Sequence, residues 1–197
     1  MRHQAQLNVR IAPLLASPVL LLSSTPAGTT LHVFSPWAGS IPARGVVIDR
    51  TLRGSCSHGS EVLTRFDAWH CYVGRRGYDP CFANTRAEVG AHVLCVSSPW
   101  EDAIAIELTK PLPLSLANPA GDPRRFPPWA MVISAGEECE LVNGSLGHVA
   151  GMRINYACAG SGVLLGLPTR GKTWTELYAA TSTAKTYSRI ALRSVWW

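Results

Sequence analysis

The sequence predicts a mainly β protein, a disulfide-stapled β-sandwich or barrel with at most one or two short helices. Seventeen glycines and 14 prolines among only 16% charged residues describe a turn-rich chain. Runs of β-branched and aromatic residues recur between these turns, as is typical of strands. Six cysteines give an even number that can pair into three disulfides.

The first 27 residues predict a secretory signal peptide. "MRHQAQLNVR" is positive without an acid, "IAPLLASPVLLL" is an apolar run, and "SSTPAG" is small and polar. The apolar run is shorter than the roughly 20 residues that a membrane span needs. We therefore expect cleavage after Ala27 and a secreted protein, extracellular or at the cell surface, with no membrane span after cleavage. A buried first strand is the open alternative.

Residues 28–45 lack periodicity and are rich in turn residues, which predicts a loosely tied N-terminal arm or linker. Residues 46–197 are then expected to form a single β-rich domain, because the chain is long enough for one ordinary core. The Pro-rich stretch 117–128 leaves a division into two lobes open, although each half would hold only a small core.

Seven runs are expected as strands. They are residues 45–49, 91–96, 102–108, 130–135, 152–159, 175–181 and 187–197. Residues 61–72 have apolar positions at helical spacing after Ser60, a candidate cap, so a short helix is as good an interpretation as a strand. Asn143-Gly144 predicts a two-residue hairpin turn.

The cysteines of an exported chain are expected to pair as disulfides. They are Cys56, Cys71, Cys81, Cys95, Cys139 and Cys158. The intervening "YVGRRGYDP", with two glycines, lets the chain fold back and favours a local Cys71–Cys81 pair. A turn at Asn143-Gly144 would set Cys139 opposite about His148, so a bond from Cys139 to Cys158 needs a wider return or a neighbouring strand. Cys56 and Cys95 would pair by elimination.

No metal site and no cofactor are expected. Metal-binding cysteines usually come in close pairs such as Cys-x2-Cys, and no two cysteines here lie closer than ten positions. His58 and His70 lie near Cys56 and Cys71, but such isolated spacings are weak indications of zinc.

The net charge of +5 is scattered along the chain, with only Arg75-Arg76 and Arg124-Arg125 as close groups. A nucleic-acid binder usually has a clustered basic stripe. We therefore expect no nucleic-acid partner, and a cell-wall or extracellular polymer or a protein as the partner.

Catalytic motifs are weak. "SCSHG" only half matches Gly-x-Ser-x-Gly, and Ser57 and His58 are merely neighbours in the sequence. A glycosidase needs two carboxylates facing each other, and no pair stands out. The candidates are Asp67, Asp79, Glu101, Asp102, Glu107, Glu137, Glu138 and Glu140. Asp79 before Pro80 is expected to form a turn, and "GEECE" a charged turn.

Seven tryptophans raise the possibility of a carbohydrate-binding surface. Core packing is the commoner fate for four of them, which are Trp69, Trp100, Trp129 and Trp174. Trp196 and Trp197, at the chain end, have no evident need to be buried.

The stretches "GSCSHGSEVLTRFDAWHC", "YDPCF", "PWAMVISAGEECEL" and "GHVAGMRINYACAGSGVLLG" carry a resemblance. About residues 54–197 resemble an uncharacterised group of exported six-cysteine proteins of actinobacterial type, with Asp-Ala-Trp-x-Cys, Asp-Pro-Cys-Phe, Pro-Trp-Ala and Asn-Tyr-x-Cys motifs. Ser57 departs from the pattern, which has tryptophan after the first cysteine. The resemblance implies export, three disulfides and a compact β-rich domain, and implies no chemistry.

Taken together, the sequence predicts a secreted, disulfide-bonded β domain with a binding or structural role outside the cell. The alternative is an extracellular hydrolase acting on carbohydrate or ester substrates. The sequence assigns neither catalytic nor binding residues.

Overall fold

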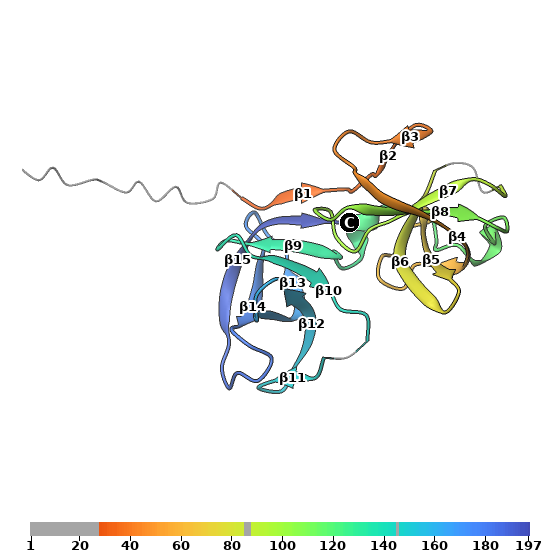
Figure 1. The fold of residues 1–197 in the computed structure, drawn as a ribbon. Helices are drawn as coiled ribbons and strands as arrows, with labels where there is room; N and C mark the ends of the chain where they lie inside the picture. The colour runs from red at the N-terminus through yellow and green to blue at the C-terminus, as the bar shows by residue number, and fades with distance from the viewer. Residues whose placement is uncertain (1–27, 85–87, 145) are drawn as a thin grey trace, which may run out of the picture.

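Two closed β-barrels make up most of the protein (Figure 1). The computed structural model describes residues 28–84, 88–144 and 146–197. Apart from strands, these residues form two short 3-10 turns, Leu114–Leu116 and Pro123–Arg125. The structure confirms the predicted β class, in its barrel form. The predicted signal peptide lies outside the described residues.

The first barrel has five strands. They are β4 (Ile48–Gly59), β5 (Ala68–Val73), β6 (Arg76–Ala83), β7 (His92–Cys95) and β8 (Ala103–Leu108). Consecutive strands are antiparallel, and the barrel closes through parallel pairing of β4 with β8. The length of β4 makes this closure possible, because its first half pairs with β8 and its second half with β5.

The second barrel has six strands, all antiparallel to their neighbours. They are β9 (Ala130–Ile133), β10 (Glu138–Leu141), β12 (Met152–Cys158), β13 (Val163–Thr169), β14 (Thr175–Ala179) and β15 (Ser188–Trp196). It closes through pairing of β15 with β9. A short strand, β11 (His148–Val149), pairs with the start of β12.

The N-terminal arm is attached to both barrels, in contrast to the loose tether expected. β1 (Thr30–His32) runs parallel to the end of β15, whose edge is free there because β14 pairs only with its first half. β2 (Trp37–Ala38) and β3 (Ile41–Pro42) form a small hairpin. The Trp37 indole N–H donates to the Phe82 carbonyl of the first barrel at 2.9 Å. Backbone pairing thus fixes a segment that has no sequence periodicity.

One hydrophobic cluster spans both barrels. Phe34 of the arm contacts Phe82 of the first barrel and Trp129 of the second, with ring centroids 5.3 and 5.7 Å away. Two further clusters lie within the first and the second barrel respectively. Residues 109–129, which include the Pro-rich stretch, connect two barrels that share part of their core.

The tryptophan predictions hold for the inner positions and fail at the chain end. Trp69, Trp129 and Trp174 are buried, and Trp100 is partly buried against the same core. Trp197 was expected to have no need of burial, yet it is fully buried and its indole N–H donates to the Phe126 carbonyl at 2.9 Å. Its position between the barrels, which the sequence does not show, explains the difference.

All seven runs expected as strands contain strand residues. Seven other strands were missed, of which four are short (β1, β2, β3 and β11) and three belong to the barrels. In the ambiguous segment, β5 begins only at Ala68, and the Ser60 hydroxyl accepts the Leu63 backbone N–H at 2.9 Å in the preceding loop. The missed barrel strands are β6, β10 and β13. Local residue types obscure the strand pattern. β6 contains the turn formers Gly77 and Pro80. β10 begins within "GEECE" (residues 136–140), which was wrongly expected to be a charged turn.

The predicted Cys71–Cys81 disulfide is wrong, and so is Cys56–Cys95. The three disulfides are Cys56–Cys71, Cys81–Cys95 and Cys139–Cys158. Each joins residues directly opposite each other on neighbouring antiparallel strands. In the β5–β6 hairpin, Cys71 lies opposite Tyr78 and Cys81 lies opposite Trp69. The register of these strands therefore keeps Cys71 and Cys81 from facing each other, although the short loop between them favoured a bond.

Cys139 reaches Cys158 by the wider return that the sequence required. β10 ends at Leu141 and pairs with β12, so the chain crosses from Leu141 to Met152 through a loop that includes β11. The two-residue hairpin predicted at Asn143-Gly144 is therefore wrong. Gly144 still adopts a positive φ of 98°, as its place in a loop permits.

Candidate functional site

A group of polar side chains lies on one side of the first barrel, at the junction of β4, β5 and β6. We call it the histidine cluster, and its members are His58, Ser60, Glu61, His70 and Asp79. The β4–β5 register places His58 directly opposite His70. Residues 79 and 80 lie in the irregular part of the β5–β6 ladder, between the pairs Trp69–Cys81 and Cys71–Tyr78. This bulge places the Asp79 carboxylate against His70, as bulges often re-aim a side chain.

Asp79 is the buried anchor of the histidine cluster. Its side chain is only 6% exposed, and it accepts hydrogen bonds from the Ser60 hydroxyl and, at 2.8 Å, from the Glu61 backbone N–H. Burial raises the pKa of this carboxyl, while the bonds from Ser60 and Glu61 oppose the rise. Asp79 was expected to form a turn, and this is wrong because it lies within β6. Its hydrogen bonds to Ser60 and Glu61 hold the chain that follows β4 in place.

The two histidines present their ring nitrogens to carboxylates. His58 Nε2 lies 3.7 Å from a Glu61 oxygen. His70 Nδ1 lies 3.9 Å from the same Glu61 oxygen and 3.6 Å from Asp79 Oδ2. The His70 ring also stacks on Tyr72, with centroids 4.6 Å apart. A Cβ on Gly77 would lie 2.9 Å from His70 Nε2, so only glycine leaves room for this ring position.

This arrangement is not a serine-hydrolase triad. Such a triad needs the histidine between the serine and the acid. Here the Ser60 hydroxyl bonds directly to Asp79. Ser57, the other serine of "SCSHG", is exposed on β4, and His58 Nδ1 bonds the Gly59 carbonyl at 2.8 Å. The residues of the half-matched motif therefore do not come together as nucleophile and base.

A second feature is a pocket of about 350 Å³ between the N-terminal arm and the first barrel. We call it the arm pocket. Its walls are mostly apolar, with Trp37 from the arm, Phe66 from the loop before β5 and Leu114 from the connection between the barrels. Phe66 and Leu114 are 59% and 67% exposed. Ser35 and Asp67 add polar groups at the same pocket.

A third feature is a pocket of about 340 Å³ beside β10, which we call the acidic pocket. Trp100, Glu138 and Glu140 line it, and the two glutamates are two positions apart on one face of the strand. Burial raises the pKa of the Glu140 carboxyl, and the neighbouring charges of Glu101 and Glu138 add to the rise. This pocket therefore brings together two of the predicted glycosidase carboxylates.

Three of the other carboxylates suggested by the sequence have structural partners. Asp67 pairs with Arg65, Glu107 with Arg53, and Glu137 accepts the Gly160 backbone N–H. Asp102 is exposed. Together with Asp79 and Glu101 it lines a further pocket, of about 330 Å³.

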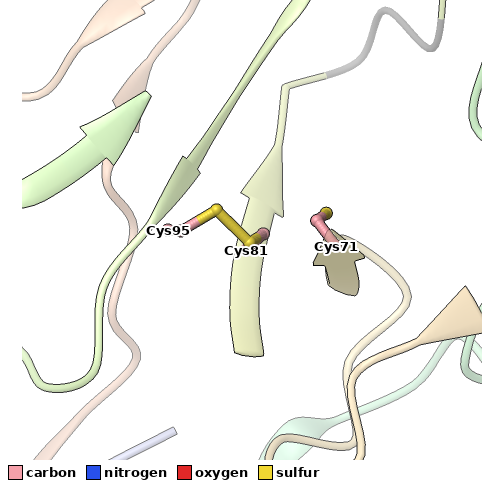
Figure 2. Close-up of side chains that lie close together, drawn as sticks. All are labelled: Cys71, Cys81 and Cys95. Atoms are coloured by element: carbon pink, nitrogen blue, oxygen red, sulfur yellow. A yellow bond between two sulfur atoms is a disulfide. The ribbon is translucent and has the colours of Figure 1, made fainter. Parts of the chain in front are cut away.

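Four cysteines lie in the first barrel, and three of their sulfurs form a close group. Figure 2 shows Cys81 bonded to Cys95, with Cys71 beside them. The three sulfurs lie within 4.8 Å of one another, and Cys71 is bonded to Cys56. Since a metal is bound by thiolate and these sulfurs are in disulfides, the group supports the barrel and offers no metal ligands.

Sequence reasoning noted His58 and His70 only as weak signals, and it missed Ser60 and Glu61 as their partners. The two histidines are twelve positions apart in the sequence, so only strand register shows that they face each other.

No helix in the described ranges is long and apolar enough to cross a membrane. Comparison of the chain with protein-family models, with curated proteins and with solved structures found no match.

Proposed function

We propose that this protein is an extracellular, disulfide-bonded β domain that binds a partner in the arm pocket. The observation that carries the proposal is an open pocket with exposed apolar residues, Phe66 and Leu114, beside Trp37. Ligand sites are typically concave and mostly apolar, with a few polar groups that orient the ligand. Three disulfides support a place outside the cytoplasm, where thiols are not kept reduced.

The walls of the arm pocket favour a ligand with a flat apolar face and a hydrogen-bonding edge. A volume of about 350 Å³ suits a unit of the size of one sugar ring. Aromatic rings such as Phe66 and Trp37 cover an apolar face, while Ser35 and Asp67 suit an edge of hydroxyl groups. A sugar unit of a cell-wall or extracellular polymer has this chemistry.

The test is binding of the mature chain, residues 28–197, to a glycan array and to isolated cell-wall polymer. We expect Phe66→Ala to weaken binding at least about tenfold, since it removes an exposed contact surface. Its stability should change by about 0.5 kcal/mol or less, because the side chain is mostly exposed. Tyr187→Ala is the matched control, as Tyr187 is another exposed aromatic residue, 43% exposed, outside the arm pocket.

Two results would contradict the proposal. One is wild-type protein that binds no polymer on the array or in the pull-down. The other is equal loss of binding in the Phe66→Ala and Tyr187→Ala variants, which would indicate a different surface.

The acidic pocket favours a second candidate, an extracellular hydrolase acting on carbohydrate or ester substrates. A glycosidase uses one carboxyl of raised pKa as an acid and a second carboxylate as a nucleophile or base. Glu140 and Glu138 match these two roles in type and position, with Trp100 beside them.

A panel of glycoside and ester substrates tests this candidate. Turnover should fall at least about a hundredfold in Glu140→Gln, because general acid catalysis supplies that much. Glu107→Gln, on the first barrel, is the control and should retain turnover. Absence of turnover by the wild type on the whole panel would remove the hydrolase from consideration.

A further inference from the structure

We propose that the histidine cluster binds a divalent transition metal of the zinc class through His58 Nε2, the Glu61 carboxylate and His70 Nδ1. Asp79 lies behind these three groups and is placed to hold them or to supply a fourth ligand. The site shares no residue with the arm pocket or the acidic pocket, so it stands apart from the proposed function.

The spacing of the ligand atoms fits a small four-coordinate ion. Zn²⁺ holds nitrogen and oxygen ligands at about 2.0 to 2.2 Å, which places tetrahedral ligand atoms about 3.3 to 3.6 Å apart. The separations here are 3.7 Å from His58 to Glu61, 3.9 Å from His70 to Glu61 and 3.6 Å from His70 to Asp79. The ligand atoms of His58, Glu61 and His70 all lie within 4.8 Å of one another. A contraction of these separations to about 3.3 to 3.6 Å completes the site.

The orientation of His58 is that of a metal ligand. Its Nδ1–H donates to the Gly59 carbonyl at 2.8 Å, which leaves the lone pair on Nε2, the nitrogen that faces Glu61. Metal-binding histidines typically donate their other ring N–H to a carbonyl or carboxylate in this way.

His70 supplies an independent observation. Its Nδ1 is buried, and among the described residues it has no hydrogen-bond partner. It nevertheless points between two carboxylates, of Glu61 and Asp79, at distances too long for hydrogen bonds. A buried polar atom without a partner is costly, and a cation between the three groups would satisfy it.

Asp79 and its partners hold the ligands in place before any metal arrives. The Asp79 carboxylate accepts from the Glu61 backbone N–H, which fixes the chain beside the Glu61 side chain. Its other oxygen accepts from the Ser60 hydroxyl. Such supporting hydrogen bonds tune metal affinity by about 10- to 100-fold.

The donor set selects the class of ion. Two imidazoles with one or two carboxylates suit Zn²⁺ and its transition-metal neighbours, whereas Mg²⁺ and Ca²⁺ prefer oxygen ligands alone. The side chains of His58 and Glu61 are 36% and 53% exposed, so an ion can enter from solvent and keep an open coordination position.

The experiment is titration of the mature, disulfide-intact chain with Zn²⁺ by calorimetry, and with Co²⁺ by visible absorption. We expect one ion per chain, a Co²⁺ spectrum of tetrahedral type, and no comparable binding of Mg²⁺. His58→Ala and Glu61→Gln, both at exposed side chains, should each weaken Zn²⁺ binding at least about tenfold. Circular dichroism of both variants checks that they remain folded.

His148→Ala is the matched control, because His148 is an exposed histidine on the second barrel. It should bind Zn²⁺ like the wild type. Failure of the wild type to bind Zn²⁺ would overturn the proposal. So would equal affinity in the His58→Ala and His148→Ala variants, since it would place the ion elsewhere.

Discussion

Glu176 is a buried carboxyl whose surroundings make the stability of the second barrel depend on pH. The residue is 2% exposed, and one of its oxygens accepts the Leu177 backbone N–H at 2.9 Å, while the other has no hydrogen-bond partner among the residues that the structure describes. Burial raises the pKa of Glu176 from its ordinary value of 4.5 to about 7, and this outweighs the Leu177 bond and the charge of Arg189. The folded chain therefore favours the protonated form.

The predicted consequence is a loss of stability as pH rises from about 4.5 to about 7. In this range the folded state keeps a proton that the unfolded state releases, so the free energy of unfolding falls with pH. The fall due to this group is about 3 kcal/mol at most, because each pKa unit corresponds to about 1.4 kcal/mol. Thermal melts between pH 4 and pH 8 measure it.

Glu176→Gln stays neutral at every pH and should remove this part of the slope. At pH 8 the variant should unfold at a higher temperature than the wild type, whereas near pH 4.5 the two should be similar. Glu107→Gln, at a side chain that is 36% exposed, is the control and should leave the slope in place. Parallel pH profiles of wild type and Glu176→Gln would show that Glu176 does not ionise in this range.

At the residue scale, the sequence predicted which side chains are buried better than it predicted their hydrogen-bond partners. Trp69 lies in β5 and Trp129 directly precedes β9, and both are buried as expected. Asp79 and Trp197 were misjudged because their partners come from elsewhere in the chain. Ser60, which bonds Asp79, is 19 positions away, and Phe126, which accepts from Trp197, is 71 positions away.

At the scale of elements, strand pairing decides the disulfides. Each cysteine pair occupies opposed positions of an antiparallel ladder, so a disulfide map is also a map of strand register. Tryptic digestion without reduction should therefore link peptide 54–65 to 66–75, and peptide 77–86 to the peptide that contains Cys95. Mass spectrometry identifies both products.

Blocking with an alkylating agent under denaturing conditions, before digestion, prevents exchange between the neighbouring sulfurs. It should modify no cysteine, because all six are paired. A link between peptides 66–75 and 77–86 would contradict the register of β5 and β6 described above.

The strands themselves were predictable where apolar residues follow one another, as in β7 and β9. They were not predictable in β6 and β10, where Gly, Pro or charged residues interrupt the pattern. Each of these strands contains a buried cysteine, Cys81 in β6 and Cys139 in β10. Each cysteine lies in a backbone pairing with a neighbouring strand. Tertiary pairing overrides local preference there, as it commonly does in sheets.

At the scale of the whole molecule, Arg65 joins the arm, the first barrel and the chain end. Its side chain is 10% exposed and forms an ion pair with Asp67. The same guanidinium donates to the carbonyls of Phe34 in the arm and of Trp197 after β15. One buried cation thus satisfies backbone groups from segments at both ends of the described chain.

We predict that Arg65→Ala lowers the free energy of unfolding by about 2 to 4 kcal/mol, because it leaves a carboxylate and two carbonyls without their donor. Arg53→Ala is the control. The Arg53 side chain is 74% exposed and pairs with Glu107, so its loss should change stability by about 0.5 kcal/mol or less. Urea unfolding followed by tryptophan fluorescence measures both.

The wild type should unfold in a single transition, since a shared hydrophobic cluster links the barrels. Two separate transitions, or an Arg65→Ala variant as stable as Arg53→Ala, would show that the barrels fold independently of this junction.

The sequence by itself determined the β class, most of the barrel strands, the pairing of all cysteines as a set, and the burial of the inner tryptophans. These properties depend on composition and on local patterns of apolar residues and turns, which are read directly along the chain. It also named His58, His70, Asp79, Glu138 and Glu140 as candidates without grouping them, and it did not single out Glu61.

The tertiary structure alone decided which of these residues meet. The division into two barrels, the partners of each cysteine and the meeting of His58, Glu61 and His70 all depend on strand register. Register is set by many weak contacts between segments distant in sequence, and a shift of one residue would turn every side chain of a strand to the opposite face. Strand register cannot be inferred from a local sequence pattern, so the residues of the candidate sites could be grouped only in the folded chain.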